Sequence, residues 1–161
     1  MTYEDHLAYE VRQLRCDIER LYDAWPAMHG ATPTRLGEGI AYFEASLLHA
    51  RNLMEFLTRG SSPHADALTP EDFGIDYYDY AAASETFEQD FGSSADSAYS
   101  RICTYVSHLS RERDVGTPTW ELQPLEQTLL ALVRQFVTLC SDKGIELPSV
   151  QAALTDEIPD W

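Results

Sequence analysis

The chain has 161 residues, of which 27 are acidic and 11 are basic, giving a formal net charge of −16, and 44% of its residues are apolar. This apolar share argues against general disorder, and the length suits one domain built around a single core. In ordinary cytosol the negative charge argues against nucleic-acid binding, whose affinity comes largely from Lys and Arg side chains that neutralise phosphates.

The charge pattern has two interpretations, because among the 11 basic residues only Lys143 is a lysine. One is a halophilic protein, since in molar salt the Debye length falls to about 3 Å and self-repulsion is screened. High salt would also weaken the argument against nucleic-acid binding. The other is an acidic binding protein that meets a basic partner. We favour the first, because the acidic residues are spread along the chain and are not collected in one tail.

Apolar residues at three- and four-residue steps predict a first long helix that begins near Thr2 and ends at Pro26 and Gly30. After a short loop, the same periodicity predicts a second helix over residues 37–59. Gly60 follows its last turn, which is where glycine commonly ends a helix. The first half of the chain is therefore expected to form two long helices.

Residues 60–93 are expected to form an irregular connection rich in Tyr and Asp, with IDYYDY at 75–80. Within it, Thr69-Pro70-Glu71-Asp72 combines a capping residue, a proline at the first helical position and two acids, which predicts a short helix. A connection of this length serves as a lid, a packed cover or a surface for a partner.

The second half of the chain carries two further helical patterns. A third helix is predicted over 95–113, and the strongest pattern of all predicts a fourth over 124–143 that ends at Gly144. A helical turn near 149–154 is expected within a C-terminal tail over 145–161.

Together these elements predict an all-α fold, with residues 1–161 forming a single-domain bundle of four to five principal helices and short accessory helices. The three cysteines, Cys16, Cys103 and Cys140, lie far apart and form no CxxC pair, so we expect neither a zinc site nor a disulfide framework. No apolar run approaches the roughly 20 residues of a membrane span, and the first ten residues lack the apolar core of a signal peptide. We expect a cytoplasmic protein.

The second predicted helix carries a dense polar cluster of His49, Arg51 and Asn52 among apolar residues. At about 100° per residue, His49 and Asn52 share one face, whereas Arg51 lies on the face of Glu44 and Glu55. One interpretation is a structural network, in which Arg51 pairs with a glutamate and the other two bind a neighbouring helix. The other is a binding site, because buried polar groups are costly unless they find partners.

The third predicted helix places Arg101, Tyr105 and His108 on one face. An arginine can hold a phosphate through two parallel hydrogen bonds, and a histidine that titrates near neutrality can move a proton. This arrangement therefore suits phosphate chemistry. The alternative is a histidine that packs between helices beside a solvated arginine.

Two stretches of the chain resemble the signatures of a family of small prokaryotic helical proteins of uncharacterised function. The first is LHARNL at 48–53 followed by Phe56, and the second is HLS at 108–110 followed by Arg113. The resemblance covers both central helices and implies a helical fold, but it carries little information on activity.

Arg101 and His108, with six residues between them, resemble the Arg-x(4–6)-His motif of HEPN domains. These are helical bundles, many of them metal-independent ribonucleases of toxin–antitoxin, abortive-infection and CRISPR systems, often active as homodimers. The resemblance implies that Arg101 stabilises a phosphate and His108 acts as general acid or base, with the 2′-hydroxyl of the RNA as nucleophile. HEPN motifs usually place Asn, Asp or His directly after the arginine, where this chain has Ile102, so a HEPN-like bundle without catalysis stays open.

No metal ion or cofactor is predicted, because the histidines show no HxxxH or HExxH spacing and no glycine-rich phosphate loop is present. Two functional hypotheses follow. In the first, the chain is a HEPN-like component of a defence or toxin–antitoxin module, acting on RNA or nucleotides through the catalytic residues Arg101 and His108. The residues expected to bind the ligand are His49, Arg51, Asn52, Tyr105 and Arg113.

In the second hypothesis the chain is a non-catalytic helical module that binds a partner protein, and its His/Arg/Asn cluster is a buried structural network. Whether the chain is an enzyme stays open at this point.

Overall fold

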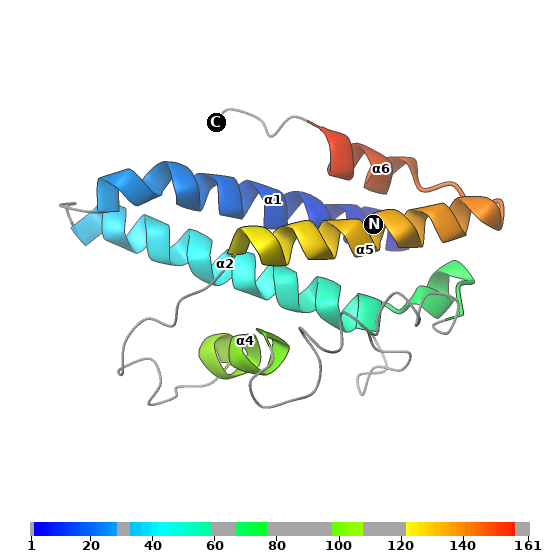
Figure 1. Cartoon of the computed structure of the whole chain (residues 1–161), viewed down its shortest axis with the longest axis horizontal. Coiled ribbons are helices and arrows are strands. Elements are labelled where there is room, and N and C mark those ends of the chain that lie inside the picture. The colour runs from blue at the N-terminus through cyan, green and yellow to red at the C-terminus, as the bar shows by residue number, and fades with distance from the viewer. Residues whose placement is uncertain (1, 29–32, 59–66, 77–97, 108–121, 157–161) are drawn as a thin grey trace.

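The computed structural model describes residues 2–28, 33–58, 67–76, 98–107 and 122–156 (Figure 1). Within these ranges every regular element is helical and no strand is present, and the helices pack as a single bundle, which confirms the predicted all-α fold. The elements are α1 (Tyr3–Met28), α2 (Pro33–Thr58), the 3₁₀ helix η1 (Pro70–Phe73), α4 (Ala98–Ser107), α5 (Leu122–Asp142) and α6 (Pro148–Thr155).

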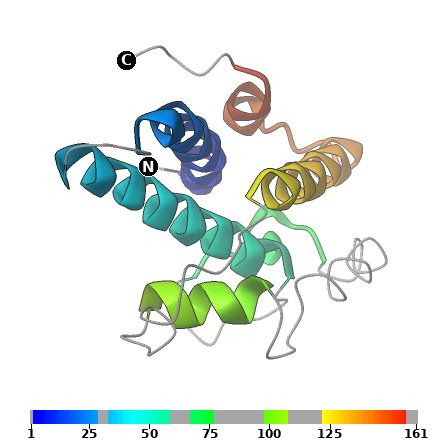
Figure 2. The ribbon, with the colours of Figure 1, turned by 60° about the vertical axis from the view of Figure 1, so that its left-hand side comes forward.

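Helices α1 and α2 run side by side in opposite directions and form the central hairpin of the bundle (Figures 1 and 2). Helix α5 lies against both of them, and α6 packs on α1 and α5. Helix α4 packs on α2 on the opposite side of the bundle from α6, as Figure 2 shows. The hairpin therefore contacts every other long element of the described structure.

The core lies where α1, α2 and α5 meet. The apolar stripe predicted for α1 is buried, from Leu7 through Val11 and Leu14 to Leu21. The large apolar side chains of the other two helices that are 0% exposed are Leu47, Leu53, Met54, Leu57, Leu129, Val133 and Phe136. Burial of these side chains is the main favourable contribution to the folding of the bundle.

Three phenylalanines attach η1 to the helices. Ring centroids lie 5.8 Å apart between Phe56 and Phe73, 5.1 Å between Phe56 and Phe136, and 5.3 Å between Phe73 and Phe136. All three pairs are edge-on, which is a favourable arrangement of aromatic rings. The cluster therefore fixes η1 beside the C-terminal half of α2.

The cap predicted at the start of η1 is present. The backbone N–H of Thr69 donates to Oδ2 of Asp72 at 2.8 Å, and the backbone N–H of Asp72 donates back to the carbonyl of Thr69 at 3.1 Å. The turn ends at Gly74, whose φ of 69° is a left-handed conformation that glycine adopts without strain. These bonds hold segment 67–76 in a defined conformation outside the long helices.

Helix boundaries differ from the prediction at three ends. Helix α1 continues through Pro26 to Met28, so its last turn contains the proline that was expected to end it. Helix α2 begins at Pro33, four residues before the expected start, since proline is pre-set for the first helical position. Helix α5 begins at Leu122, before the expected start at residue 124. Of the third predicted helix, over residues 95–113, the structure describes only Ala98–Ser107.

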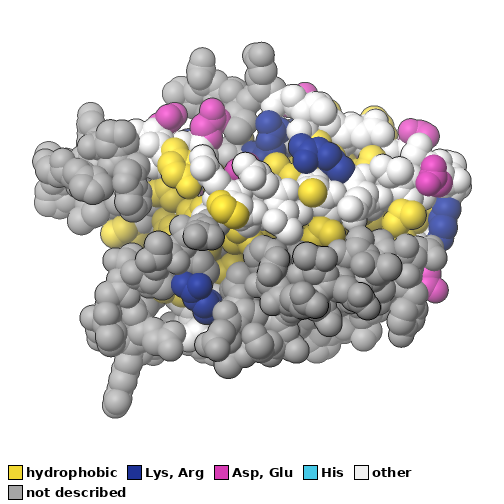
Figure 3. Space-filling model, viewed as in Figure 1, with side chains coloured by type: hydrophobic (Ala, Val, Ile, Leu, Met, Phe, Trp, Pro, Cys, Tyr) yellow, Lys and Arg dark blue, Asp and Glu magenta, His cyan; other side chains and the backbone are white. Residues whose placement is uncertain are grey.

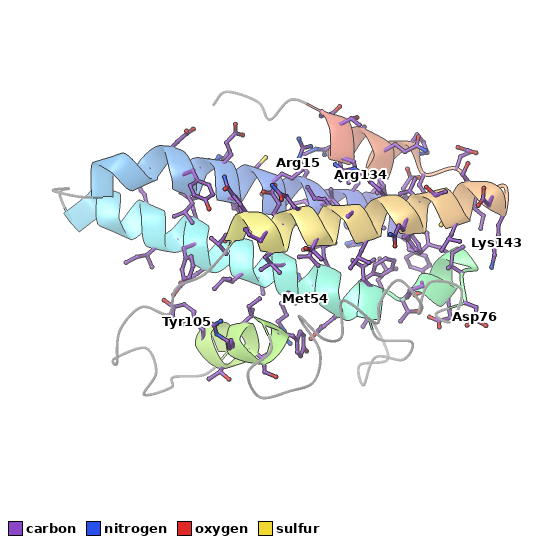
Figure 4. All side chains as sticks on the ribbon, viewed as in Figure 1. Arg15, Met54, Asp76, Tyr105, Arg134 and Lys143 are labelled. Carbon is purple, nitrogen blue, oxygen red and sulfur yellow. The ribbon has the colours of Figure 1, made fainter. Side chains whose placement is uncertain are left out.

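The helical turn expected in the C-terminal tail is the two-turn helix α6, and α1 holds it in place. Arg15 (Figure 4) donates to the carbonyl oxygens of Ala153 and Asp156 at 2.5 and 3.0 Å. At the other end, the carboxylate of Glu4 accepts the backbone N–H of Ser149 at 2.6 Å. The described part of the tail, up to Asp156, is thus an integral part of the bundle.

Among the described residues, acidic side chains lie at several separate places on the face shown in Figure 3. None of the described helices combines the length and apolar character that a membrane-spanning helix needs.

Candidate functional site

A carboxylate on α1 organises the polar cluster of α2. Oε2 of Glu10 accepts a hydrogen bond from Nδ1 of His49 at 2.7 Å and another from Nδ2 of Asn52 at 3.1 Å. The two donors are three residues apart, so they occupy one face of α2, as the sequence predicted. The cluster is therefore a set of contacts across the α1–α2 hairpin.

His49 faces a second carboxylate on its other side. Its Nε2 lies 3.7 Å from Oδ2 of Asp17, and only 12% of its side chain is exposed. Burial raises the pKa of Asp17, while the charges of His49 and Arg20 act in the opposite direction. The ring of Tyr9 packs edge-on against the imidazole, with centroids 5.8 Å apart. Both ring nitrogens of His49 thus face carboxylates of α1.

Arg51 belongs to a different cluster, on the side of α2 that faces α4. Its Nε and Nη2 donate to Oε1 of Glu55 at 3.2 and 3.0 Å, one of the two glutamate partners that the sequence offered. The hydroxyl of Tyr99 on α4 donates to the same oxygen at 2.6 Å. Burial and this hydrogen bond to Glu55 raise the pKa of Tyr99. The cluster predicted as one site is therefore divided between the α1–α2 and the α2–α4 contacts.

The residues proposed for phosphate chemistry are only partly described. On α4, Arg101 is half-buried, Ile102 is fully buried, and the ring of Tyr105 packs edge-on against Phe43 at a centroid distance of 5.6 Å (Figure 4). Tyr105 thus contributes to the packing of α4 on α2. His108 and Arg113 lie outside the described residues, so the predicted pairing of Arg101 with His108 stays a prediction.

A cavity of about 560 Å³ lies between α1, α2 and the segment that leads into η1. Its polar lining comes from three elements: His6 and Glu10 on α1, Asn52 and Glu55 on α2, and Asp72 on η1. Three of these five side chains are carboxylates. Glu10 and Glu55 are also the acceptors of the two polar clusters, so the cavity lies where both clusters meet.

The remaining lining of the cavity is apolar or aromatic. Leu7, Leu53 and Phe56 belong to the buried core, Leu68 packs against it, and Tyr3 is 57% exposed. A cavity of this size with an apolar wall and a few polar groups is typical of a site for a small ligand or for a side chain of a partner.

One feature of the sequence points to this cavity. His6 and Glu10 stand four residues apart and therefore on one face of α1. Of the other polar lining residues, Asn52 and Glu55 belong to α2, and Asp72 belongs to a segment for which only the cap was predicted. The position of η1 beside α2 depends on the phenylalanine cluster, which no local pattern specifies.

The cysteines are placed as packing residues. Cys16 and Cys140 are buried and Cys103 is half-buried, and none of the three forms a disulfide. Burial raises the pKa of the Cys140 thiol to about 11 and also raises that of Cys16. Across the described ranges, no group of three or more His, Cys, Asp or Glu side chains is placed to hold a metal ion.

Comparison of this chain with protein-family models, curated proteins and solved structures found no match. The resemblances to the family of small prokaryotic helical proteins and to HEPN domains therefore stay predictions.

Proposed function

We propose that this chain is a non-catalytic helical binding module, in which His49, Arg51 and Asn52 belong to two structural networks. The observation that carries the proposal is the engagement of His49 and Asn52 by one carboxylate oxygen of Glu10 on the neighbouring helix. Nδ1 of His49 and Nδ2 of Asn52 are thus engaged within the α1–α2 hairpin, which supports a structural role for both side chains.

The position of His49 argues against a role in proton transfer. A general acid or base must come within hydrogen-bond reach of the proton that it moves on the substrate. The two ring nitrogens of His49 instead lie 2.7 Å from Glu10 and 3.7 Å from Asp17. Removing one member of such a network deprives its partner of one hydrogen bond, at a cost of about 1–3 kcal/mol for a buried group.

The proposed partner is basic. A net charge of −16 attracts cationic molecules over long range and raises the rate of encounter with them. The same charge, together with a single lysine, supports the further expectation of a cytoplasmic protein adapted to high salt. In molar salt the long-range attraction is screened, so selectivity would then depend on groups in direct contact with the partner.

The competing hypothesis remains a HEPN-like, metal-independent ribonuclease of a defence or toxin–antitoxin module. It is supported by the spacing of Arg101 and His108 and by the half-buried position of Arg101 on α4. It would assign His108 a direct role in cleavage, whereas the binding-module proposal assigns none to any residue of the chain.

A cleavage assay on total RNA separates the two hypotheses. The purified chain and its His108→Ala variant are incubated with RNA in low salt and in molar KCl, and melting curves are recorded on the same samples. We expect no cleavage by either protein. Cleavage by the unchanged chain that is lost in a folded His108→Ala variant would overturn the proposal and establish a ribonuclease.

A further inference from the structure

We propose that the cavity between α1, α2 and segment 67–72 binds a positively charged nitrogen group carried on an apolar stem. An alkylammonium or a guanidinium group on an aliphatic chain has this chemistry. The inference rests on the proposed function, because it names the kind of group that the binding module recognises.

The charged lining of the cavity favours a cation. Three carboxylates, those of Glu10, Glu55 and Asp72, line it together with His6, and no Lys or Arg is among its described lining residues. Arg51 pairs with Glu55 but is not itself part of the lining. An anionic ligand would meet like charges on all three elements, so phosphates and carboxylates are disfavoured there.

Glu10 is held in place with capacity left for a ligand. Both of its hydrogen bonds, from His49 and Asn52, reach Oε2, and within the described ranges none reaches Oε1. A carboxylate can accept about four hydrogen bonds, so Oε1 can accept from an ammonium or guanidinium group. Because neighbouring side chains already fix the orientation of Glu10, binding would need little further ordering of this group.

The second carboxylate belongs to a different element and is also fixed. Oδ2 of Asp72 accepts from the backbone N–H of Thr69 at 2.8 Å and lies 3.2 Å from its hydroxyl. Phe73, the next residue, is buried against Phe56 and Phe136. A cation between α1 and η1 would therefore meet two carboxylates that the fold has already positioned.

The rest of the lining suits an apolar stem. Leu7, Leu53, Phe56 and Leu68 line the cavity, and each methylene group buried against them raises affinity by about fourfold. The exposed ring of Tyr3 can add a cation–π contact. A wholly apolar ligand fits less well, because it would remove carboxylates from water without giving them a partner. The volume of about 560 Å³ lies within the range of small-ligand sites.

Two sources could present this chemistry, a free amine or a Lys or Arg side chain of a partner protein. The direct test uses NMR titrations of the ¹⁵N-labelled full chain with hexylammonium, hexanoate and methylammonium. A capped Leu-Lys-Leu peptide forms the protein-side-chain arm. Tighter binding of the peptide than of hexylammonium would assign the site to a partner protein, and the reverse order would assign it to a free amine; either order supports the proposal.

We expect hexylammonium to cause saturable chemical-shift changes at the backbone amides of Glu10, Asn52 and Leu68. Its affinity should be at least about tenfold higher than that of hexanoate, a difference that one ion pair can supply. Methylammonium should bind more weakly than hexylammonium, because it lacks the stem. Equal binding of hexylammonium and hexanoate would overturn the proposal. So would the absence of saturable shifts with hexylammonium and with the peptide up to about 20 mM, well above a millimolar Kd.

Matched variants locate the site. Ala67→Phe fills the cavity without removing a charge, and Glu10→Gln removes one charge, so each should weaken hexylammonium binding by about tenfold or more. Glu38→Gln is the control, since it removes an exposed carboxylate about 20 Å from the cavity along α2 and should change affinity by less than about twofold. Unchanged binding in a folded Ala67→Phe variant would overturn the proposal.

If no cation binds in this cavity, the proposed function as a binding module still stands. If the chain cleaves RNA, the proposed function and the cation site that rests on it are both overturned.

Discussion

His49 on α2 and Glu10 on α1 join the two helices of the central hairpin through a hydrogen bond of 2.7 Å between Nδ1 and Oε2. The same oxygen accepts from Asn52 one turn further along α2, and Asp17 lies beyond the other nitrogen of the imidazole. Two turns of α1 are thereby connected to one turn of α2. The cluster that the sequence offered as a site contributes to the fold, and it also fixes Glu10 at the edge of the cavity.

Replacing Asn52 by alanine should reduce stability, because Glu10 would lose one of its two donors. We expect the free energy of unfolding, measured by urea denaturation followed by circular dichroism, to fall by about 1–3 kcal/mol. Gln135→Ala is the matched control, since it removes an exposed amide from α5 and should change stability by less than about 0.5 kcal/mol. Equal effects of the two substitutions would contradict a structural role for Asn52.

Replacing Tyr99 by phenylalanine should loosen α4. The hydroxyl of Tyr99 donates to Glu55 at 2.6 Å, and a hydrogen bond to a charged group contributes about 1.5–3 kcal/mol. Hydrogen exchange should show a larger loss of protection in α4 than in the α1–α2 hairpin. The control Tyr22→Phe replaces an exposed tyrosine of α1. It should leave hydrogen-exchange protection unchanged in α4 and in the hairpin. A uniform loss of protection across the chain would argue against a local contact between α2 and α4.

The partly buried carboxyl group of Glu126 gives a prediction about pH. Burial raises its pKa above the usual value of 4.5, with Arg15 acting in the opposite direction. The folded state therefore binds this proton more tightly than the unfolded state, so stability is lost as the pH rises from 4.5 through the folded pKa. Glu126→Gln should stabilise the protein at pH 7, and this gain should vanish below about pH 4.5.

Glu38→Gln controls for the general relief of negative charge in that experiment, because Glu38 is exposed. Thermal melts from about pH 3.5 to 7.5, a range set by the usual carboxyl pKa, measure both variants. A gain for Glu126→Gln that is no larger than the gain for Glu38→Gln at pH 7 would contradict the effect of burial.

Cys140 should resist alkylation in the folded protein. Its pKa of about 11, against a usual value of 9.0, lowers the thiolate fraction at pH 8 by about a hundredfold, and its side chain is 0% exposed. Iodoacetamide labelling followed by mass spectrometry should modify Cys140 at least about a hundredfold more slowly than the half-buried Cys103. Similar rates for these two cysteines in the native protein would be inconsistent with the described core.

Much of the fold could be predicted from the sequence, because it depends on local periodicity. The spacing of Leu7, Val11 and Leu14 specifies the buried face of α1, and the cap at Thr69 specifies η1. The same helical geometry places Arg51 and His49 on different faces of α2, which is why their assignment to separate clusters could be anticipated.

The cavity could not be predicted in the same way. Glu10 and His49 are 39 residues apart in the chain, and their contact depends on the register of α1 against α2. That register results from the packing of many apolar side chains, and several registers satisfy the same helical stripe. The position of Asp72 at the same cavity as Glu10 depends further on the three phenylalanines that pack edge-on, which come from three separate elements.

A double-mutant cycle between Glu10 and His49 tests most directly the claim that this histidine holds the hairpin together. Glu10→Ala, His49→Ala and the double variant are compared by urea denaturation. We predict a coupling energy of about 0.5–3 kcal/mol, as found for residues in one hydrogen-bonded network. Additive effects, with His49→Ala costing less than about 0.5 kcal/mol as at an ordinary surface position, would contradict the account and return His49 to the candidate ligand-binding residues.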